Sequence, residues 1–520
     1  MSDEEKYKGI SLIKEEIEVM NSLKNTLKIS IPVYPKYEDD NLLVCIRDCH
    51  VVSLTIKFQE LKELPHNIGD LKFLEELYLD GNELINLPSN FGKLETLKIL
   101  YLNNNKLKSL PESFGNLTSL KIISILDNNI KEIPYCFGNL SNLEEISISN
   151  LTKTFPDTFY QLDSLKKLYI FDSEISYIPD NFSKLKSLEI LEIHNSKIRN
   201  LPVNFGLLSS LVYIDLHSVK LENLPDSIGA LKNLEVLKIN NNFIEELPKT
   251  IGNLKKLKIF EANNNKISSL PKSIGDLENL VNLEMNDNRI EFLPEEFSKL
   301  NNLKSLNFDS NNISSLPDSF GSLSNLSILK MRNNKIKALP KSFGNLNNLN
   351  NLEIQNNSIN ILEDSFCSLK SLKSLDIRFN QLKTLPYEFW NLKSIESLYL
   401  SSNQIDILPE NFGKCENISY LEIENNKLKD LPESFELVQN LRILNLSRNQ
   451  IENFPNCLFQ LKSIERMYLM KNNINNFPKN ILNMSNLLIL DISFNPNLQI
   501  NEEFKKIVEE LENQRCQIIF

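Results

Sequence analysis

Residues 74–96 read LEELYLDGNELINLPSNFGKLET, and residues 97–119 read LKILYLNNNKLKSLPESFGNLTS in the same register. Self-similarity at a fixed period indicates a repeat architecture in which each unit is one supersecondary element. Every complete unit has 23 residues except the one that begins at Leu143, which has 22. The nineteen complete units and one partial unit begin at positions 51, 74, 97, 120, 143, 165, 188, 211, 234, 257, 280, 303, 326, 349, 372, 395, 418, 441, 464 and 487.

Each position of the unit has a physical role. Residues 77–79, Leu-Tyr-Leu, alternate with period two, which predicts a short strand whose leucines enter the core. Asn82 and its equivalents follow the strand, where an amide can hydrogen-bond the backbone of neighbouring turns in a buried ladder. Pro88 then fixes a bend, Phe91 fills the core, and Gly92 allows close packing of the backbone.

A unit of this kind cannot bury its own apolar face, so neighbours must stack and both ends of the array need caps. We predict an N-terminal helical cap region over residues 1–50, the repeat array over 51–500 and a C-terminal helical cap over 501–520. Apolar stripes at helical spacing support both caps. They consist of Ile10, Ile13, Ile17, Met20, Leu23 and Leu27, and of Phe504, Ile507, Val508 and Leu511, which an apolar tail at 518–520 follows.

The composition limits the kinds of partner. The net charge is −11, from 57 Lys and Arg against 68 Asp and Glu, and no run of five or six like charges occurs. This balance argues against nucleic acid or an anionic membrane surface as the main partner. The apolar fraction of 41% allows a large core, and the lack of an apolar run of 18 or more residues predicts no membrane insertion.

The N-terminus and the cysteines indicate the compartment. The N-terminal stretch MSDEEKYKGISLIKEEIEV is acidic and lacks the basic and apolar regions of a secretory signal. The seven cysteines are odd in number, and only Cys45 and Cys49 lie close together in the chain. We therefore expect a cytoplasmic protein with reduced thiols.

The signature L-x-x-L-x-L-x-x-N-x-L-x-x-L-P-x-x-F/I-G-x-L resembles the intracellular leucine-rich-repeat group that includes the Ras-binding scaffolds, the plant Ras-group repeat proteins, and Scribble and erbin. Pattern and resemblance together predict an α/β fold, a right-handed leucine-rich-repeat solenoid (horseshoe) with a parallel concave sheet of about 20 strands, one per unit. The resemblance also implies a scaffold for signalling proteins, with a small GTPase as the leading partner.

Three consecutive units depart from the usual surface composition. The third, fifth and seventh residues of each unit point out from the strand, and most of them are Ser, Asn, Asp, Glu or Lys. Exposed aromatic residues beside charges are typical of an interface hot spot, so we predict that a protein partner binds these three units. The predicted partner-binding residues are Tyr169, Phe171, Glu192, His194, Tyr213, Asp215 and His217.

The same units lack the ladder asparagine. Ser173, Ser196 and Val219 stand in its place, directly after the 22-residue unit. Serine replaces part of the hydrogen bonding of an amide and valine replaces none, so we expect a local change in curvature or twist. Departures from local rules gather at functional sites, although drift in a tolerant array is the alternative explanation.

Other functions and other surfaces stay open at this stage. A recognition receptor for foreign or damaged proteins and a structural role through self-association are alternatives to the scaffold. The enzyme-class alternative is a metal-assisted hydrolase built on Glu192, His194, Asp215 and His217. It would need an enclosed pocket, which an open solenoid does not readily supply. Since no G-x-x-x-x-G-K-[ST] phosphate loop or other catalytic motif is evident, we expect a non-enzymatic protein without cofactor or metal.

Two further sets are weaker binding candidates. The first is a mixed-charge set, Lys330, Arg332, Glu353, Asp376 and Arg378, and the second is Tyr399, Tyr420, Arg466 and Tyr468. Charged faces are usually only solvated. Trp390 follows Phe389 at the usual glycine position, and we expect it to pack rather than to recognise a partner.

Overall fold

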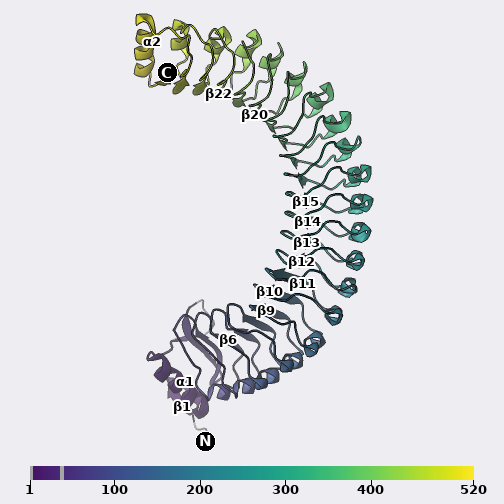
Figure 1. The fold of residues 1–520 in the computed structure, drawn as a ribbon. Coiled ribbons are helices and arrows are strands. Elements are labelled where there is room, and N and C mark those ends of the chain that lie inside the picture. Colours follow the sequence, from purple (N-terminus) through teal and green to yellow (C-terminus); the bar gives the residue numbers. More distant parts are fainter. Residues whose placement is uncertain (1–3, 35–39) are drawn as a thin grey trace. The chain divides into compact units, whose positions relative to one another are not determined.

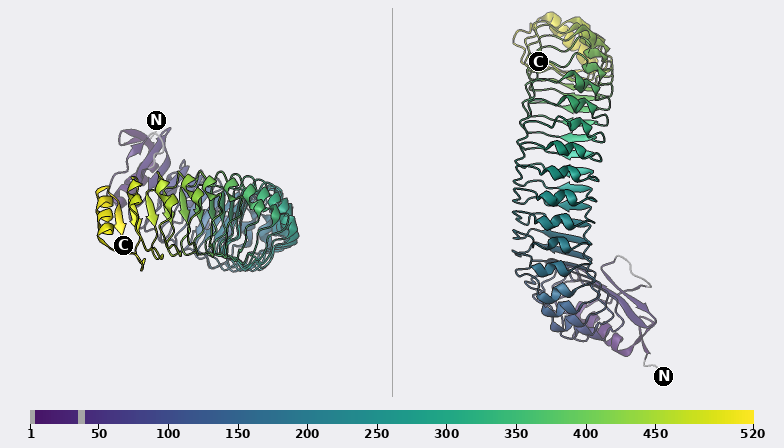
Figure 2. Two further views of the ribbon diagram at one scale, coloured as in Figure 1. Left: turned by 90° about the horizontal axis from the view of Figure 1, so that it is seen from above. Right: turned by 90° about the vertical axis from the view of Figure 1, so that its right-hand side faces the viewer.

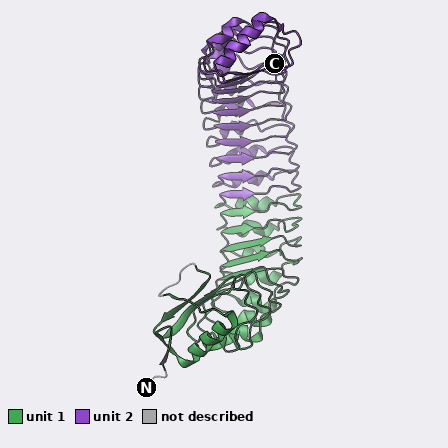
Figure 3. Ribbon diagram, turned by 90° about the vertical axis from the view of Figure 1, so that its left-hand side faces the viewer, with its two compact units in different colours: residues 1–257 green, residues 258–520 purple. Residues whose placement is uncertain are grey.

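The computed structural model describes residues 4–34 and 40–520 of the chain. These residues belong to two compact units, Met1–Leu257 and Lys258–Phe520, which Figure 3 shows in different colours. The boundary follows Leu257, the first residue of a repeat, so it does not interrupt the repeat pattern of the sequence.

The first unit begins with an antiparallel hairpin and a helix, followed by the sheet that carries the repeats (Figure 1). The hairpin and helix are β1 (Glu4–Tyr7), β2 (Ile10–Ile13) and α1 (Lys14–Leu27). The strands of the sheet are β3 (Val33–Tyr34), β4 (Leu42–Arg47), β5 (His50–Ile56), β6 (Glu76–Tyr78), β7 (Ile99–Tyr101), β8 (Ile122–Ile125), β9 (Glu145–Ser149), β10 (Lys167–Phe171), β11 (Ile190–His194), β12 (Tyr213–Asp215) and β13 (Val236–Lys238). From β5 onward, neighbouring strands of this unit pair in parallel, and each belongs to one repeat.

The second unit continues with parallel strands and ends with a helix and a final strand. Its strands are β14 (Ile259–Glu261), β15 (Asn282–Glu284), β16 (Ser305–Asn307), β17 (Ile328–Lys330), β18 (Asn351–Glu353), β19 (Ser374–Asp376), β20 (Ser397–Tyr399), β21 (Tyr420–Glu422), β22 (Ile443–Asn445), β23 (Arg466–Tyr468), β24 (Ile489–Asp491) and β25 (Gln517–Ile519). Helix α2 spans Glu502–Asn513. Within this unit all pairs from β14 to β25 are parallel.

Each complete repeat carries a short 3-10 helix on the side opposite its strand, and Figure 2 shows those of the second unit as a continuous row. In the first unit these are η1 (Ile68–Asp70), η2 (Phe91–Lys93), η3 (Glu112–Asn116), η4 (Tyr135–Asn139), η5 (Asp157–Gln161), η6 (Asp180–Lys184), η7 (Phe205–Leu207), η8 (Asp226–Ala230) and η9 (Lys249–Asn253). In the second they are η10 (Lys272–Asp276), η11 (Glu295–Lys299), η12 (Phe320–Ser322), η13 (Lys341–Asn345), η14 (Asp364–Ser368), η15 (Phe389–Asn391), η16 (Phe412–Lys414), η17 (Glu433–Leu437), η18 (Asn456–Gln460) and η19 (Lys479–Asn483).

The core lies between the strands and the short helices of each unit. Strand leucines such as Leu77 and Leu79 are fully buried. The phenylalanines that open the short helices stack face to face from one repeat to the next, with ring centroids 6.1 Å apart for Phe91 and Phe114 and 5.7 Å apart for Phe114 and Phe137. Burial of such side chains stabilises the fold by about 1.5–3 kcal/mol each, which no single repeat achieves without its neighbours.

The predicted asparagine ladder is present in the regular repeats. Asn105 illustrates it: its Nδ2 donates to Leu79 O at 2.9 Å and to Leu102 O at 3.1 Å. Its Oδ1 accepts from Leu84 N at 3.0 Å. One buried amide therefore satisfies backbone groups of its own repeat and of the preceding one, as the sequence pattern predicted.

The glycine after the core phenylalanine is required by a close approach between repeats. A Cβ atom on Gly92 would lie 1.9 Å from the carbonyl oxygen of Ser113 in the next repeat. No side chain fits at that distance without displacing backbone, so glycine at this position fixes the spacing of neighbouring short helices.

The N-terminal segment differs from the predicted continuous helical stripe. Ile10 and Ile13 lie in β2, and α1 begins only at Lys14. The reason is the tight turn at Lys8 and Gly9, with φ of 50° and 87°, which folds β1 back on β2. The edge of β5 is paired antiparallel with β4 rather than covered by the helix.

Helix α1 is attached to the first repeat through a buried carboxylate. Glu16 is fully buried, and its Oε2 accepts a hydrogen bond from Val51 N at 2.8 Å. Its Oε1 lies 3.2 Å from Nδ1 of His50. Burial raises the pKa of Glu16, and the Val51 and His50 contacts oppose that shift.

The C-terminal helix forms where the sequence predicts it, and the tail after it is a strand. In α2 the residues Phe504, Ile507, Val508 and Leu511 are buried, and Asn501 Oδ1 caps the helix by accepting from Phe504 N at 2.9 Å. The apolar tail was expected only to follow this stripe; it forms β25, which pairs in parallel with β24. The division into separate caps at 1–50 and 501–520 stays a prediction.

Neither α1 nor α2 combines the length and the apolar character that crossing a membrane requires, and none of the short helices in residues 4–34 and 40–520 does so.

Candidate protein-binding surface

The structure brings the seven predicted partner-binding residues together on three adjacent strands of the first unit. In the register of β10, β11 and β12, Tyr169 pairs with Glu192, and Glu192 pairs with Asp215. All seven side chains are half-buried on the outward face of the sheet. We call this set the aromatic-histidine patch; it comprises Tyr169, Phe171, Glu192, His194, Tyr213, Asp215 and His217.

Rings form a continuous row across the patch. The centroids of Tyr169 and Phe171 are 6.5 Å apart, those of Phe171 and His194 are 5.1 Å apart, and those of His194 and His217 are 5.8 Å apart. Ring contacts at such distances are favourable beyond area burial alone. The row therefore presents a preformed surface whose side chains lose little freedom when a partner binds.

The charges of the patch are only partly satisfied within the protein. His194 Nε2 lies 3.5 Å from Asp215 Oδ2, which is an ion-pair distance longer than a good hydrogen bond. His194 Nε2 and Asp215 Oδ1 are both buried and have no hydrogen-bond partner in the protein. Buried polar groups without partners are costly, so this pair departs from the rule that such groups are satisfied.

The environment shifts the protonation of two patch residues. The Asp215 carboxylate raises the pKa of His194, and burial only partly offsets this effect. Burial raises the pKa of Glu192, with His194 acting in the opposite direction. The imidazolium form of His194 is therefore favoured up to a higher pH than in an unperturbed histidine.

Longer strands accompany the loss of the ladder asparagine in β9, β10 and β11, but not in β12, which has three residues. In the regular repeats a strand such as β6 has three residues, whereas β9, β10 and β11 have five. The hydroxyl groups of Ser173 and Ser196 are buried without partners. The backbone bond that follows the strand is kept: Asp172 N donates to His194 O at 3.1 Å, as Asn104 N donates to Leu126 O at 2.9 Å in a regular repeat. In the register of β10 and β11, Phe171 and His194 are strand partners.

The metal-assisted alternative finds no geometric support. Among residues 4–34 and 40–520, no group of three or more His, Cys, Asp or Glu side chains is arranged to hold a metal ion. His194 and Asp215 make the ion pair described above, and Asn241 Nδ2 lies 3.1 Å from Nε2 of His217.

The two weaker candidate sets of the second unit consist largely of side chains that already have partners. Arg332 pairs with Asp309 at 2.6 Å, and Arg378 pairs with Asp376 at 2.6 Å. The guanidinium of Arg378 also lies 5.2 Å from the ring centre of Tyr399. These contacts stabilise the surface without a ligand, so the first patch stays the favoured candidate.

Trp390 has the packing environment that its position predicts. The ammonium groups of Lys393 and Lys414 lie 4.4 and 5.0 Å from its ring centre. Cation–π contacts of this kind stabilise the half-buried ring of Trp390.

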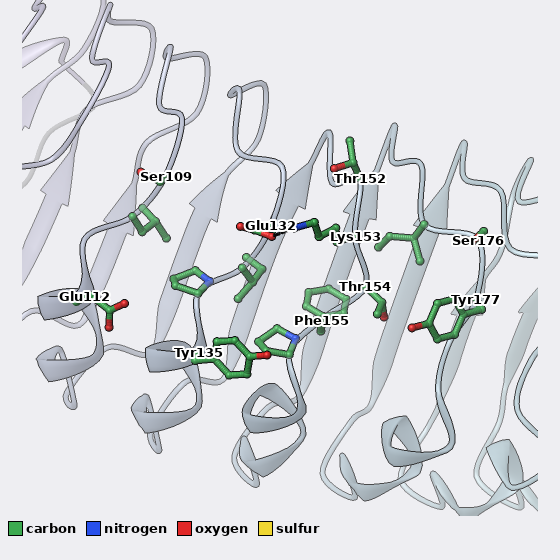
Figure 4. Close-up of a pocket in the computed structure, with 15 residues that line it drawn as sticks. Ser109, Glu112, Glu132, Tyr135, Thr152, Lys153, Thr154, Phe155, Ser176 and Tyr177 are labelled. Atoms are coloured by element: carbon green, nitrogen blue, oxygen red, sulfur yellow. Dashed lines mark hydrogen bonds and ion pairs between the residues drawn. The ribbon is translucent and has the colours of Figure 1, made fainter.

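Sequence reasoning missed a second surface feature in the same unit. A hollow of about 760 Å³ lies along the segments between strands β7–β10 and the short helices η3–η6 (Figure 4). The 22-residue repeat runs through its middle, and this irregular length was the signal that could have indicated it. Its lining consists of Ser109, Leu110, Glu112, Glu132, Ile133, Pro134, Tyr135, Thr152, Lys153, Thr154, Phe155, Pro156, Ile175, Ser176 and Tyr177.

The fold and the exposed patch define a repeat protein whose class consists of binding modules rather than catalysts. Three family models match the chain, and all describe leucine-rich repeats. The model "Leucine-rich repeat region" matches residues 38–127, 204–285 and 249–331. "Leucine rich repeat" matches 336–382, 348–405 and 416–474, and "BspA type Leucine rich repeat region" matches 87–205.

Solved structures lead to the same family. The chain is similar to a leucine-rich-repeat protein of Leptospira interrogans, with 32% identity, a TM-score of 0.63, and coverage of 73% of this chain and 96% of the other. The chain belongs to the leucine-rich-repeat protein family, and both of its units have the solenoid fold of that family. No curated protein sequence matches it.

Two more distant structures share the fold alone. One is the Drosophila Toll–Spatzle complex, with 20% identity, a TM-score of 0.62, and coverage of 88% of this chain and 75% of the other. The second is the Arabidopsis receptor kinase HAESA in complex with the peptide hormone IDA and the co-receptor SERK1, with 23% identity, a TM-score of 0.56, and coverage of 94% and 96%.

Proposed function

We propose that this chain is a non-enzymatic interaction scaffold that binds a folded protein partner at the aromatic-histidine patch. The observation that carries the proposal is the ring row from Tyr169 to His217, next to a buried carboxylate oxygen of Asp215 that has no partner. Rigid aromatic anchors beside desolvated polar groups are the composition of interface hot spots.

The lengthened strands support the same proposal. Because β10 and β11 continue through Phe171 and His194, these side chains are fixed by backbone pairing before any partner arrives. Preorganisation reduces the entropy cost of association, which raises affinity without further contacts. Phe171 and His194 are the pair whose truncation we expect to weaken binding most.

We propose a signalling protein, with small GTPases as the leading class, as the partner, and the cytoplasm as the location. The partner class rests on the resemblance of the repeat signature to Ras-binding scaffolds. The location rests on the free thiols of Cys49, Cys136, Cys367, Cys415, Cys457 and Cys516. Burial raises the pKa of Cys367, Cys415 and Cys457 to about 12, so these thiols stay protonated and unreactive at neutral pH.

The direct test is a binding titration with purified small GTPases, each loaded with GDP or with a non-hydrolysable GTP analogue, and observed by biolayer interferometry. Wild type is compared with the double variant Tyr169→Ala, Phe171→Ala. The matched control is Tyr78→Ala, Tyr101→Ala, which removes a stacked tyrosine pair from the same face of β6 and β7.

We expect binding that the patch variant weakens at least about tenfold and that the control leaves unchanged. Equal losses in both variants would indicate damage to the sheet rather than a binding site. Binding that neither variant changes would place the interface elsewhere, and lack of binding to every GTPase would remove the GTPase class.

A receptor module is the second candidate, because similar solved structures include receptors in complex with ligands. A receptor would bind an extracellular peptide or protein. The same pair of variants, tested against proteins secreted by the source cells, distinguishes this candidate. A secreted ligand that binds wild type but not the patch variant, together with no binding to any GTPase, would favour the receptor module.

A further inference from the structure

The hollow beside the short helices lies in the same unit as the patch but on different segments of the chain. Its walls come from four consecutive repeats, in the stretches 109–112, 132–135, 152–156 and 175–177. Figure 4 shows Tyr135 and Tyr177 on opposite sides of Thr154 and Phe155. The hollow is therefore a trough that crosses several repeats rather than an enclosed cavity.

A change in hydrogen bonding marks the short repeat at the centre of the trough. In a regular pair of repeats, Lys106 N donates to Leu84 O at 2.9 Å and Lys108 N donates to Ile85 O at 3.2 Å. In the short repeat, Thr152 N and Lys153 N both lie within bonding distance of Lys131 O, at 2.9 and 3.4 Å. The missing residue therefore falls at the edge of the trough, where the chain takes a shorter path.

Two exposed tyrosines stand on the walls. Tyr135 is 74% exposed and Tyr177 is 56% exposed, although both are large and partly apolar. Phe155 lies between them in Figure 4, and Pro134 and Pro156 also contribute to the lining. Aromatic and proline side chains grouped along a shallow trough are the surface that extended peptide segments recognise.

One end of the trough is suited to a basic side chain. Glu112 and Tyr135 occupy the same position, directly after the proline, in adjacent repeats, so a carboxylate and an exposed ring lie side by side. Glu132 is paired with Lys153, whereas Glu112 is exposed and adds one uncompensated negative charge to the lining. A carboxylate next to an aromatic face is the combination that binds Arg or Lys.

The other end of the trough is apolar and loosely packed. Behind Phe155 and Tyr177 lies a void of about 10 Å³, lined mainly by isoleucines and aromatic rings. Tyr160, which contributes to this lining, is almost fully buried, and its hydroxyl group has no hydrogen-bond partner. Tyr177 is exposed in front of this void, so an apolar side chain of a ligand can pack against its ring.

We propose that this trough is a second binding site, which takes an extended segment of a protein with a basic residue at the Glu112–Tyr135 end and an apolar residue at the Phe155–Tyr177 end. Two repeats separate Tyr135 from Tyr177, which is about 12 Å, since the rings of neighbouring short helices are 5.7 and 6.4 Å apart. An extended chain covers that distance in about three to four residues. The expected motif is therefore a Lys or Arg followed or preceded, three or four positions away, by Leu, Phe or Pro.

The probe for this site is a phage-displayed library of random twelve-residue peptides. The library is first depleted on the Tyr135→Ala, Tyr177→Ala variant and then selected on the wild-type chain. We expect enriched peptides to share a basic residue three or four positions from an apolar one. Failure to enrich any peptide, or enrichment of peptides without a basic residue, would contradict the proposal.

An enriched peptide, synthesised with a fluorophore, is then titrated by anisotropy. We expect Tyr135→Ala and Tyr177→Ala each to weaken binding about tenfold, because exposed tyrosines supply most of the contact area. Glu112→Gln should weaken the same peptide about threefold to tenfold, yet leave unchanged a peptide whose basic residue is replaced by Ala.

Matched controls separate the trough from general surface effects. Tyr387 occupies the same repeat position as Tyr135 and is 62% exposed, and Phe292 occupies the position of Tyr177 and is 57% exposed. Tyr387→Ala and Phe292→Ala should bind the peptide as wild type does. The patch variant Tyr169→Ala, Phe171→Ala should also bind it normally, so this test fails or succeeds independently of the proposed function.

Two further outcomes would contradict the proposed occupant of the trough. If light scattering shows that Tyr135→Ala, Tyr177→Ala changes the oligomeric state, the trough accommodates a second copy of this chain. If the Glu112→Gln variant binds the basic peptide as tightly as wild type does, charge recognition at this end is absent. Either result overturns the proposal.

Discussion

The repeats that begin at 143, 165, 188 and 211 differ from those of the second unit in the residue at the position of the ladder asparagine. In the second unit the ladder asparagine recurs without exception from Asn265 to Asn495. In the four irregular repeats it is missing or replaced. Where the ladder is complete, the strands of the second unit have three residues, and much of the charge on their outward face forms ion pairs within the unit. Where the ladder is broken, strands β9, β10 and β11 have five residues. The aromatic-histidine patch and the trough both lie in this irregular stretch.

This contrast shows how a repeat protein can create a site without adding a domain. Asparagine amides end each strand by drawing the backbone groups that follow it into the ladder. In β10 and β11, whose repeats lack them, strand pairing extends to Phe171 and His194. Irregular repeats, rather than conspicuous motifs, are therefore the places to search for function in such an array.

The largest expected effect is the removal of one regular ladder residue. Asn311 donates to Met285 O and Phe308 O at 2.9 and 3.2 Å and accepts from Ile290 N at 2.9 Å. Asn311→Ala leaves these buried groups unpaired, and we expect a local destabilisation of about 2–3 kcal/mol. Amide hydrogen exchange of β15 and β16 measures it, since a long repeat array need not unfold in one step.

The counterpart in the irregular stretch is Ser173→Ala. The Ser173 hydroxyl is buried and has no partner, so its removal should change exchange in β10 and β11 by less than about 0.5 kcal/mol, or stabilise them slightly. A loss comparable to that of Asn311→Ala would mean that Ser173 takes part in a ladder after all.

At Tyr160 we expect an effect that is smaller than that of Asn311→Ala and opposite in sign. This residue stands at the usual glycine position, and burial raises the pKa of its hydroxyl to about 12. Tyr160→Phe removes a buried group without a partner and should stabilise the first unit by about 1 kcal/mol in local hydrogen exchange. In the control Tyr7→Phe, a buried tyrosine loses a hydrogen bond to Ile31 O, so that variant should be destabilised.

The smallest effect concerns the protonation of the patch. The Asp215 carboxylate raises the pKa of His194 above its ordinary value of about 6.5. The stabilisation from this pair is therefore fully present below about pH 6.5 and is lost as pH rises through the higher folded-state value.

NMR titration of the His194 ring protons checks this shift. We expect Asp215→Asn to lower the titration midpoint clearly and Asp172→Asn to lower it only slightly, because Asp172 contributes least among the groups that raise it. An unchanged midpoint in Asp215→Asn would show that the 3.5 Å contact carries no electrostatic weight.

Much of the fold follows from the sequence because the same residue pattern recurs in nineteen complete units and one partial unit. The strand positions, the ladder and its interruption at Ser173, Ser196 and Val219 are set by period and side-chain type. Neighbouring parallel strands hold equivalent positions side by side, which is why residues 23 positions apart, such as Tyr169 and Glu192, could be predicted to form one patch.

The ends of the chain and the trough could not be predicted in this way, for physical reasons. Ile10 and Ile13 fit helical spacing, but the turn at Gly9 and pairing with β1 outweigh that pattern. The tail 518–520 carries no strand signal beyond apolar character, and β25 forms because β24 offers an open edge. The trough depends on where the backbone shortens within the repeat at Leu143, which repeat length alone does not state.

The glycine at the close approach between short helices limits which repeats can be duplicated within the array. A side chain at position 92 would collide with the backbone carbonyl oxygen of Ser113, which belongs to the following repeat and not to the repeat of Gly92. Because the contacted atom is a backbone carbonyl oxygen, a copied repeat that carries this glycine meets the same steric limit whichever repeat follows it. Tyr160, whose ring packs against Phe182 of the next repeat, and Trp390 occupy the same position, so a copy of either repeat must also accommodate a large side chain and should be tolerated less well than a copy of a glycine repeat.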